Sequence, residues 1–265
     1  MRKVTMPSGL TLLSADATKG ATVRPPVLCV HGMFGGAWQF EGWLPLLAAR
    51  GYEAQSLDLR GHHGSRPVPD LGRVSVRDYV DDALEAARAL GNPIIIGHSM
   101  GGLIAQKVAE AGAVRAAVLL CAAPPRGILV TSAPLIGRQL KHMPNMLRSR
   151  PLVASRADSD WLMFNRTPRD QADAIFARLA PESGTAGREM SFGLIAVAEQ
   201  RVTCPVLSVT ASDDRFVVPR IGRALAKKYK AESLVADGHA HLAISEPGFE
   251  KIASTVIDWL DRVAR

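Results

Sequence analysis

PIIIGHSMGG, residues 93–102, is the stretch that decides the fold. Its β-branched run at 94–96 predicts a buried strand, and the residues that follow at 103–110 predict a helix. Ser99 falls on the sharp turn between them, in the G-x-S-x-G pattern of a nucleophile elbow. Gly97 and Gly101 provide the small size that closely packed strand and helix backbones require. The pattern predicts a serine exposed at the end of a sheet, and the alternative is a serine that merely caps the helix.

Apolar runs alternate with amphipathic segments on both sides of this stretch. Further strands are predicted at 27–30, 54–59, 116–121, 205–210 and 233–236, and helices at 41–50, 76–90, 220–229 and 249–263. A short hairpin is predicted within residues 1–20. This alternation is typical of βαβ units, so we expect an α/β protein with a mostly parallel central sheet and helices on both faces.

The alternation stops between residues 124 and 201, where no apolar strand run occurs. Helices are predicted there at 135–147, 170–179 and 188–197. We therefore expect one core domain formed by residues 1–123 and 202–265. Residues 124–201 are expected to form a helical cap, or lid, inserted over one end of the sheet.

Composition narrows the class of protein. A chain of 265 residues with 47% hydrophobic residues can bury the core of one α/β domain. The net charge of +7 comes from scattered basic residues, and the one tight cluster, KKYK at 227–230, lies at the end of a predicted helix. Cations complement the helix dipole at that end, so we expect no nucleic-acid partner.

Cysteines and paired histidines argue against metal sites and disulfides. Cys29, Cys121 and Cys204 are odd in number and widely spaced, which argues against a disulfide framework and favours free thiols in a reducing compartment. His62 and His63 are adjacent and point apart in an extended segment, so a structural loop is favoured over a metal site. With no signal-peptide run near residue 1 and no membrane-length apolar run, we expect a cytoplasmic protein without a membrane span.

Candidate partners for Ser99 follow the last two predicted strands. One strand runs into the pair Asp213 and Asp214, and the other runs into His239 and His241. Because the carboxyl ends of parallel strands meet at one edge of a sheet, we expect an acid and a histidine to lie near the serine. A serine hydroxyl is a weak nucleophile that needs such a base, oriented by a third group.

Four motifs in this order carry a family resemblance. They are HGM at 31–33, GHSMGG at 97–102, SDDR at 212–215 and the segment from His241 to the EPG at 246–248. Over nearly its whole length the sequence resembles the α/β-hydrolase superfamily, as a serine esterase-like or lipase-like member with a helical cap. The resemblance implies an α/β-hydrolase fold.

The resemblance also implies roles for individual residues. Ser99 would be the nucleophile, His241 the general base and Asp214 the acid that orients the base. Asp214 and His241 are preferred over Asp213 and His239 because each stands at the family's usual distance from the motif that follows it. The two neighbours remain alternatives.

The resemblance assigns the oxyanion hole to the backbone N–H groups of Met33 and Met100. The cap is rich in methionine and aromatic residues, which suits an adaptable apolar pocket, although these side chains could equally form the cap's own core. The side chains expected to border the substrate pocket are Phe34, His98, Met143, Trp161 and Phe164.

Some activities of the superfamily are disfavoured by single residues. Dehalogenases and epoxide hydrolases carry Asp at the position of Ser99, and plant-type hydroxynitrile lyases carry Thr and Lys at the positions of Gly32 and Leu242. We expect a cofactor-free, metal-free hydrolase of small to medium apolar carboxylic esters that forms an acyl-serine, as a monomer or homodimer. The alternatives are a thioester, lactone or C–C bond hydrolase, a cofactor-free haloperoxidase or perhydrolase, and a non-catalytic ligand receptor on the same fold.

Overall fold

The computed structural model describes residues 1–18, 22, 24–128 and 133–263, and it is built on one eight-stranded sheet. The strands are β1 (Arg2–Thr5), β2 (Thr11–Ala15), β3 (Val27–Val30), β4 (Ala54–Asp58), β5 (Ile94–His98), β6 (Ala116–Leu120), β7 (Val206–Ala211) and β8 (Glu232–Ala236), in the sheet order β1-β2-β4-β3-β5-β6-β7-β8. Among them only β2 runs against its neighbours, while all pairs from β4 to β8 are parallel. The prediction of a mostly parallel sheet is confirmed, and so is the N-terminal hairpin.

Helices cover both faces of this sheet, as predicted. The core helices are α1 (Trp43–Ala49), α2 (Val76–Ala89), α3 (Met100–Glu110), α9 (Pro219–Tyr229) and α10 (Phe249–Val263). α1 and α10 pack on one face, and α2, α3 and α9 pack on the other. The central strands β3, β5 and β6 are buried along their whole length because both faces are covered, which explains their continuous apolar runs.

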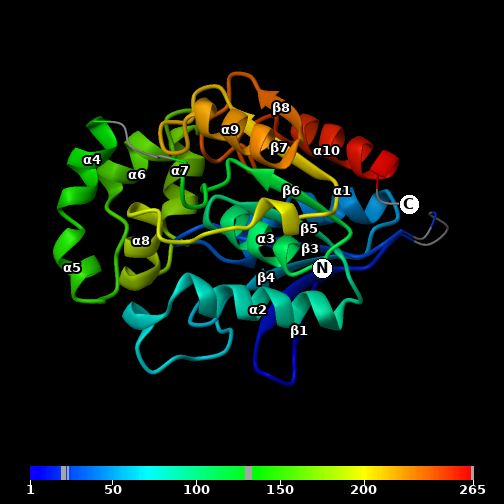
Figure 1. Cartoon of the computed structure of the whole chain (residues 1–265), viewed down its shortest axis with the longest axis horizontal. Helices are drawn as coiled ribbons and strands as arrows, with labels where there is room; N and C mark the ends of the chain where they lie inside the picture. The colour runs from blue at the N-terminus through cyan, green and yellow to red at the C-terminus, as the bar shows by residue number, and fades with distance from the viewer. Residues whose placement is uncertain (19–21, 23, 129–132, 264–265) are drawn as a thin grey trace.

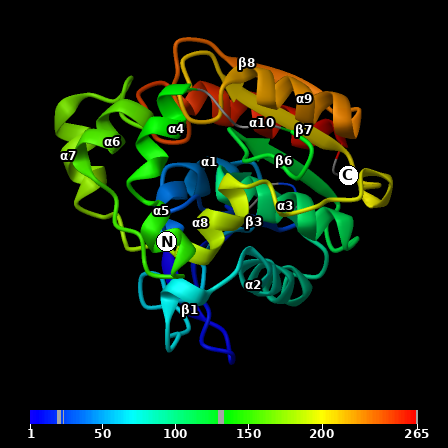
Figure 2. The same ribbon diagram turned by 60° about the vertical axis from the view of Figure 1, so that its left-hand side comes forward.

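Five further helices of the described chain lie between β6 and β7. They are α4 (Ala133–Leu140), α5 (Met143–Leu147), α6 (Arg156–Leu162), α7 (Arg169–Phe176) and α8 (Gly184–Ser191). Figures 1 and 2 both show α4 to α7 gathered at one end of the molecule, to the left of the sheet. The described ranges also contain three short 3₁₀ helices: Ala37–Phe40, Leu71–Arg73 and Glu199–Arg201.

The helix expected at 170–179 is present as α7, whereas the other two helices expected in the segment 124–201 need correction. The predicted helix at 135–147 is two helices, α4 and α5, and α6 was not predicted. The predicted helix at 188–197 is also wrong, because the Ser183 hydroxyl caps α8 four residues earlier and Gly193, with φ of +60°, follows its end. Residues 129–132 lie outside the described part.

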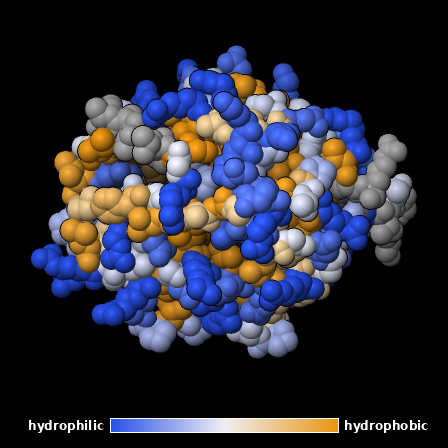
Figure 3. Space-filling model, viewed as in Figure 1, coloured by the Kyte–Doolittle hydropathy of each residue, from blue (hydrophilic) through white to orange (hydrophobic). Residues whose placement is uncertain are grey.

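In the N-terminal part of this segment, the described side-chain polar contacts of α4 and α5 stay within residues 124–201. Among the described residues, every side-chain hydrogen bond and ion pair of α4 and α5 ends on another residue of the segment. These helices also expose large apolar side chains, Ile136, Leu140 and Leu147. Figure 3 shows orange atoms over the left of the molecule, where Figure 1 places α4 and α5.

Two remaining expectations concern the cysteines and the membrane. Cys29 and Cys121 are buried, Cys204 is half-buried, and all three are free thiols. No helix within the described ranges is long and apolar enough to cross a membrane.

Candidate functional site

Ser99 sits on a strained turn between β5 and α3. Its φ of +53° and ψ of −117° lie in a region that side-chain-bearing residues rarely adopt. The turn is tight because a Cβ atom on Gly97 would lie 2.1 Å from the Gly101 carbonyl oxygen, and one on Gly101 would lie 2.1 Å from the Val30 carbonyl oxygen. The Ser99 side chain makes no capping hydrogen bond to α3, so the helix-cap alternative does not describe it.

Three buried side chains form a hydrogen-bonded chain at this turn. His241 Nε2 lies 3.0 Å from Ser99 Oγ, and His241 Nδ1 lies 2.9 Å from Asp214 Oδ2. The other oxygen of Asp214, Oδ1, accepts hydrogen bonds from the backbone N–H groups of Phe216 and Val217, each 2.8 Å long. Both carboxylate oxygens are therefore satisfied, and the acid is fixed in orientation.

This arrangement selects one tautomer of His241. A carboxylate accepts only, so the proton on Nδ1 is donated to Asp214 and the lone pair of Nε2 faces the Ser99 hydroxyl. The imidazole is placed to take the serine proton. Such a set of groups can generate a nucleophilic alkoxide as it attacks a bound carbonyl.

The neighbouring candidates face other partners. Asp213 forms an ion pair with Arg166, and its carbonyl oxygen accepts a 3.0 Å hydrogen bond from Asn165. His239 Nδ1 lies 3.3 Å from Glu246 Oε2. The structure thus brings Asp214 and His241 to Ser99 and leaves Asp213 and His239 outside the chain.

The loop after β3 lies directly against the serine. A Cβ atom on Gly32 would come within 2.9 Å of Ser99 Cβ. The Gly32 N–H donates to Gln39 Oε1 at 3.0 Å, and the Phe34 N–H donates to Glu182 Oε2 at 3.3 Å. Within the described ranges, the N–H groups of Met33 and Met100 form no hydrogen bond to another residue.

Two buried and uncharged histidines, His31 and His98, lie next to the site. Burial, reinforced by a neighbouring histidine in each case, lowers the pKa of His31 and of His98 to about 3. His98 Nε2 donates to the His241 carbonyl oxygen at 2.8 Å, and His31 Nδ1 donates to the Gly32 carbonyl oxygen at 2.8 Å. Each imidazole therefore supports the backbone of a site segment and carries no charge of its own at neutral pH.

The adjacent histidines after β4 point to different partners. His62 is buried, with Nε2 3.4 Å from Glu182 Oε2, whereas His63 Nε2 accepts a 3.1 Å hydrogen bond from the Trp38 indole. Within the described chain no group of three or more His, Cys, Asp or Glu residues is arranged to hold a metal ion.

A cavity of about 130 Å³ opens beside Ser99 and His241. Phe34 and His98 line it, as expected. Most of its remaining wall is apolar and comes from α4, α5, α6, α8 and the loop after β7: Leu135, Met146, Leu162, Met163, Met190, Phe216 and Val217.

Three residues expected at the pocket are absent from its wall: Met143, Trp161 and Phe164. Trp161 is held between two guanidinium groups, with Arg138 at 4.5 Å and Arg215 at 5.4 Å from its ring centre. Phe164 packs into a separate small apolar cluster, and Met146, on the same helix as Met143, lines the cavity. The rotation of each helix about its own axis determines which of its side chains face the cavity, and this rotation could not be determined from composition.

Gln39 and Glu182 are site neighbours that the sequence did not single out. Gln39 lies shortly after the glycine-rich loop in the sequence and accepts a hydrogen bond from Gly32 of that loop, so its proximity in the sequence could have indicated this contact. Glu182 is remote in sequence, at the start of the capped helix α8, and only its burial in the folded protein makes it stand out.

Comparison with known proteins bears on this arrangement. The model of the alpha/beta hydrolase family matches residues 27–251. The chain is 26% identical over 259 residues to a pyrethroid hydrolase of Sphingobium wenxiniae, covering 90% of this chain and 88% of that protein. A thermophilic esterase of Thermogutta terrifontis superposes with a TM-score of 0.73 at 19% identity, over all of both chains. A carboxylesterase structure from Nitrososphaera gargenis gives 0.74 at 19% identity, over 99% and 98% of the two chains.

Proposed function

Because the chain belongs to the alpha/beta hydrolase family, we propose that it hydrolyses carboxylic esters of small to medium apolar substrates through an acyl-serine intermediate. The observation that carries the proposal is the chain from Ser99 Oγ through His241 to Asp214, with links of 3.0 and 2.9 Å, at the wall of an apolar cavity. The similarity to a protein named as a pyrethroid hydrolase supports ester hydrolysis.

Acylation begins at the serine hydroxyl. Ser99 Oγ attacks the ester carbonyl carbon while its proton passes to His241 Nε2, and the carbonyl oxygen becomes an oxyanion. Asp214 stabilises the imidazolium that forms and keeps its proton-bearing Nδ1 oriented. When the tetrahedral intermediate collapses, the alcohol leaves with the proton from His241 Nε2, and the acyl group remains on Ser99.

Deacylation repeats these steps with water. His241 Nε2 takes a proton from a water molecule as the water oxygen attacks the acyl carbon. The second tetrahedral intermediate then releases the carboxylic acid, and His241 returns the proton to Ser99 Oγ. Atoms and protons balance over the cycle, with one water consumed for each ester bond broken, so the chemistry needs no cofactor.

The oxyanion of both intermediates would be held by the N–H groups of Met33 and Met100. Preorganised backbone donors of this kind contribute about 3–4 kcal/mol each to transition-state stabilisation. Among the described residues these two amides have no other hydrogen-bond partner, and Gly32 lies close to Ser99; both observations support this role. The nearby N-terminus of α3 adds a favourable field for negative charge.

We propose that the segment 124–201 acts as the cap that shapes the substrate pocket. A cavity of about 150 Å³ holds a benzene-sized group, so the 130 Å³ here suits one small apolar part of an ester. Helices α4, α5, α6 and α8 supply much of its apolar wall, and this cover would limit the access of water to the acyl-serine.

A panel of p-nitrophenyl esters of increasing acyl length tests the proposal. We expect turnover by the unaltered protein and a loss of at least about 10⁴-fold in Ser99→Ala. A fluorophosphonate should modify Ser99, as located by peptide mass spectrometry. The matched control is Ser254→Ala, at an exposed position on α10, which should keep both ester turnover and labelling of Ser99. Absence of turnover together with absence of labelling would refute the proposal.

A further inference from the structure

Glu182 is a fully buried carboxylate that the reaction cycle does not use. It belongs to the segment between α7 and α8, far in sequence from Ser99, yet it reaches the loop after β3. Its Oε1 accepts hydrogen bonds of 2.6 Å from the Tyr79 hydroxyl and from the Ser183 N–H. Its Oε2 accepts the 3.3 Å hydrogen bond from the Phe34 N–H. A buried acid with this many donors is tightly positioned.

The backbone on either side of Met33 is held by these contacts. The preceding residue, Gly32, donates its N–H to Gln39, and the following residue, Phe34, donates its N–H to Glu182. The Phe34 carbonyl oxygen accepts a 2.9 Å hydrogen bond from the Ala180 N–H, so the cap grips both polar groups of this residue. Phe34 has a φ of +62°, a conformation that persists only where the surroundings hold it.

The hydrogen bond between the Phe34 N–H and Glu182 also determines which backbone N–H group of this loop can donate to a substrate. The Phe34 N–H is occupied by Glu182 and so does not compete for an oxyanion. The Met33 N–H is left without a described partner, in a loop pinned at both neighbouring residues. An oxyanion donor must be aimed before the reaction starts, because reorganisation during the reaction would cost part of the stabilisation.

The negative charge of Glu182 is balanced by His62. His62 Nδ1 donates to the Arg60 carbonyl oxygen at 3.0 Å, so its Nε2 faces Glu182 Oε2 and makes a favourable contact only when it also carries a proton. The rings of His31 and Tyr79 pack against His62 at 5.2 and 5.9 Å, and Asp58 adds a weaker attraction. The attraction between Nε2 and the carboxylate therefore favours the protonated form of His62 and the ionised form of Glu182.

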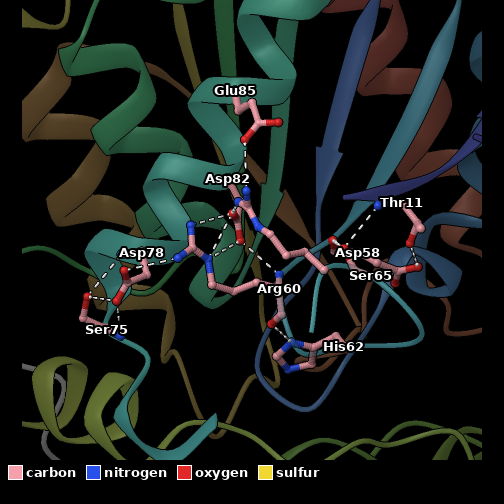
Figure 4. A network of polar contacts seen from close by, with 10 residues as sticks. Thr11, Asp58, Arg60, His62, Ser65, Ser75, Asp78, Asp82 and Glu85 are labelled. Carbon is pink, nitrogen blue, oxygen red and sulfur yellow. Dashed lines mark hydrogen bonds and ion pairs between the residues drawn. The ribbon is translucent and has the colours of Figure 1, made fainter. Parts of the chain in front are cut away.

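His62 is itself held by a polar network shown in Figure 4. Arg60 donates to buried Asp82 on α2 from its backbone N–H and from its guanidinium, with bonds of 2.7 to 3.0 Å. Arg66 forms a further ion pair with Asp82. The loop that carries His62 is thus fixed to the core, and Glu182 docks on a partner already in place.

From these contacts we infer that Glu182 is a positioning residue, which couples the docked cap to the oxyanion hole by holding Phe34 so that the Met33 N–H points at the substrate carbonyl. The inference rests on the proposed ester hydrolysis and adds a residue to it. The cap then contributes to the rate of the chemical step as well as to the shape of the pocket.

The test compares three variants with the same p-nitrophenyl ester. Glu182→Gln replaces two acceptor oxygens by one, and Glu182→Asp keeps the charge but shortens the reach to Phe34. We expect both to lower kcat about 10–100-fold with KM changed less than about 3-fold, since the lost contact acts in the transition state. Affinity for a trifluoromethyl ketone, which forms a tetrahedral adduct, should fall in parallel.

Ser183→Ala is the matched control. Its hydroxyl ties the same segment to the carbonyl oxygens of Gly72 and Val74, without touching the loop after β3. We expect kcat within about 3-fold of the unaltered enzyme. If Ser183→Ala loses as much kcat as Glu182→Gln, or if Glu182→Gln keeps normal kcat, the inference is overturned, while activity of the unaltered enzyme still upholds the proposed function.

A measurement on the unaltered enzyme covers the case in which neither Glu182 variant folds. In ¹⁵N-labelled protein, the trifluoromethyl ketone adduct should shift the Met33 amide resonance strongly and the Phe34 amide resonance little, because the latter stays on Glu182. Equal shifts at both amides would show that Glu182 does not hold Phe34, and would contradict the inference.

Discussion

Asp213 and Asp214 are adjacent in the chain, but their carboxylates serve different parts of the molecule. Asp214 turns inward, 2.9 Å from His241, and is buried. Asp213 turns outward to Arg166, so it ties the segment 124–201 to the loop after β7. One loop therefore orients the candidate base and contacts this segment.

The first prediction separates these two acids. Asp214→Asn should lower kcat/KM by about 10³–10⁴-fold, because an amide can hold His241 in the wrong tautomer and cannot stabilise an imidazolium. Asp213→Asn should change kcat/KM by less than about 3-fold, since an exposed ion pair contributes at most about 1 kcal/mol. The measurement is ester turnover with folded protein confirmed by circular dichroism. A larger loss in Asp213→Asn would reverse the assignment.

The two histidines allow a parallel comparison. His241→Ala should lower turnover to within about 10³–10⁴-fold of the uncatalysed rate, because among the described residues no other side-chain base is hydrogen-bonded to Ser99 Oγ. His239→Ala should retain activity and lose about 1 kcal/mol of stability, since its contact with Glu246 disappears. Ester turnover and urea unfolding measure these effects. Inactivity confined to His239→Ala would show that the base is misassigned.

The third prediction concerns the close packing of Gly97 in the turn that carries Ser99. Gly97→Ala places a Cβ atom 2.1 Å from the Gly101 carbonyl oxygen, so we expect a loss of at least about 2–3 kcal/mol in the free energy of unfolding. Gly137→Ala on α4 is the control, because nothing lies within 4 Å of the added atom. It should gain about 0.5–1 kcal/mol from the better helix propensity of alanine. Similar stabilities for the two variants would mean that the turn is not as tight as described.

A fourth prediction maps the pocket from α4. Leu135→Trp adds bulk to the cavity wall and should reduce kcat/KM for a long acyl ester about 10-fold or more, with the acetate ester affected less. The next residue, Ile136, is 44% exposed, so Ile136→Trp should leave the chain-length profile unchanged. Equal effects of the two substitutions would argue against the cavity as the acyl site.

The fifth prediction is a pH dependence of stability from the pair of His62 and Glu182. Burial opposes the charge on each group, but their mutual attraction outweighs it, which raises the pKa of His62 and lowers the pKa of Glu182. The His62 contribution is complete below its ordinary value of 6.5 and is lost as the pH rises through the raised pKa. The Glu182 contribution is complete above 4.5 and is lost as the pH falls through the lowered pKa.

Urea unfolding of His62→Gln between pH 5.5 and 9 checks this sign. The stability advantage of the unaltered protein over His62→Gln should shrink as the pH rises, by at most about 1.4 kcal/mol per pH unit for one proton. His63→Gln is a control of opposite sign, because burial lowers the pKa of His63. A His62→Gln difference that stays constant with pH would rule out the charged pair.

Much of the core could be predicted from the sequence because its signals are local. The apolar run before Gly97 and the alternation of strands and helices depend on burial and backbone geometry within a few residues. The proximity of Ser99 to the two loops that carry its candidate partners could also be predicted, because the carboxyl ends of parallel strands share one edge of the sheet. Selecting Asp214 and His241 needed the family resemblance as well.

The cap was less predictable for a physical reason. Its helices are short, and their boundaries depend on single caps such as Ser183 and on contacts with the core. The partner of Glu182 is set by tertiary packing, which no local pattern encodes. The same holds for Trp161, whose ring is held by two arginines and does not line the cavity.

The self-contained polar contacts of α4 and α5 make this stretch a separable module. Its side chains contribute Leu135 and Met146 to the cavity, yet its hydrogen bonds and ion pairs among the described residues leave the core untouched. A change of an apolar side chain within residues 133–147 would therefore reshape the wall of the cavity without breaking a side-chain hydrogen bond or ion pair to the core.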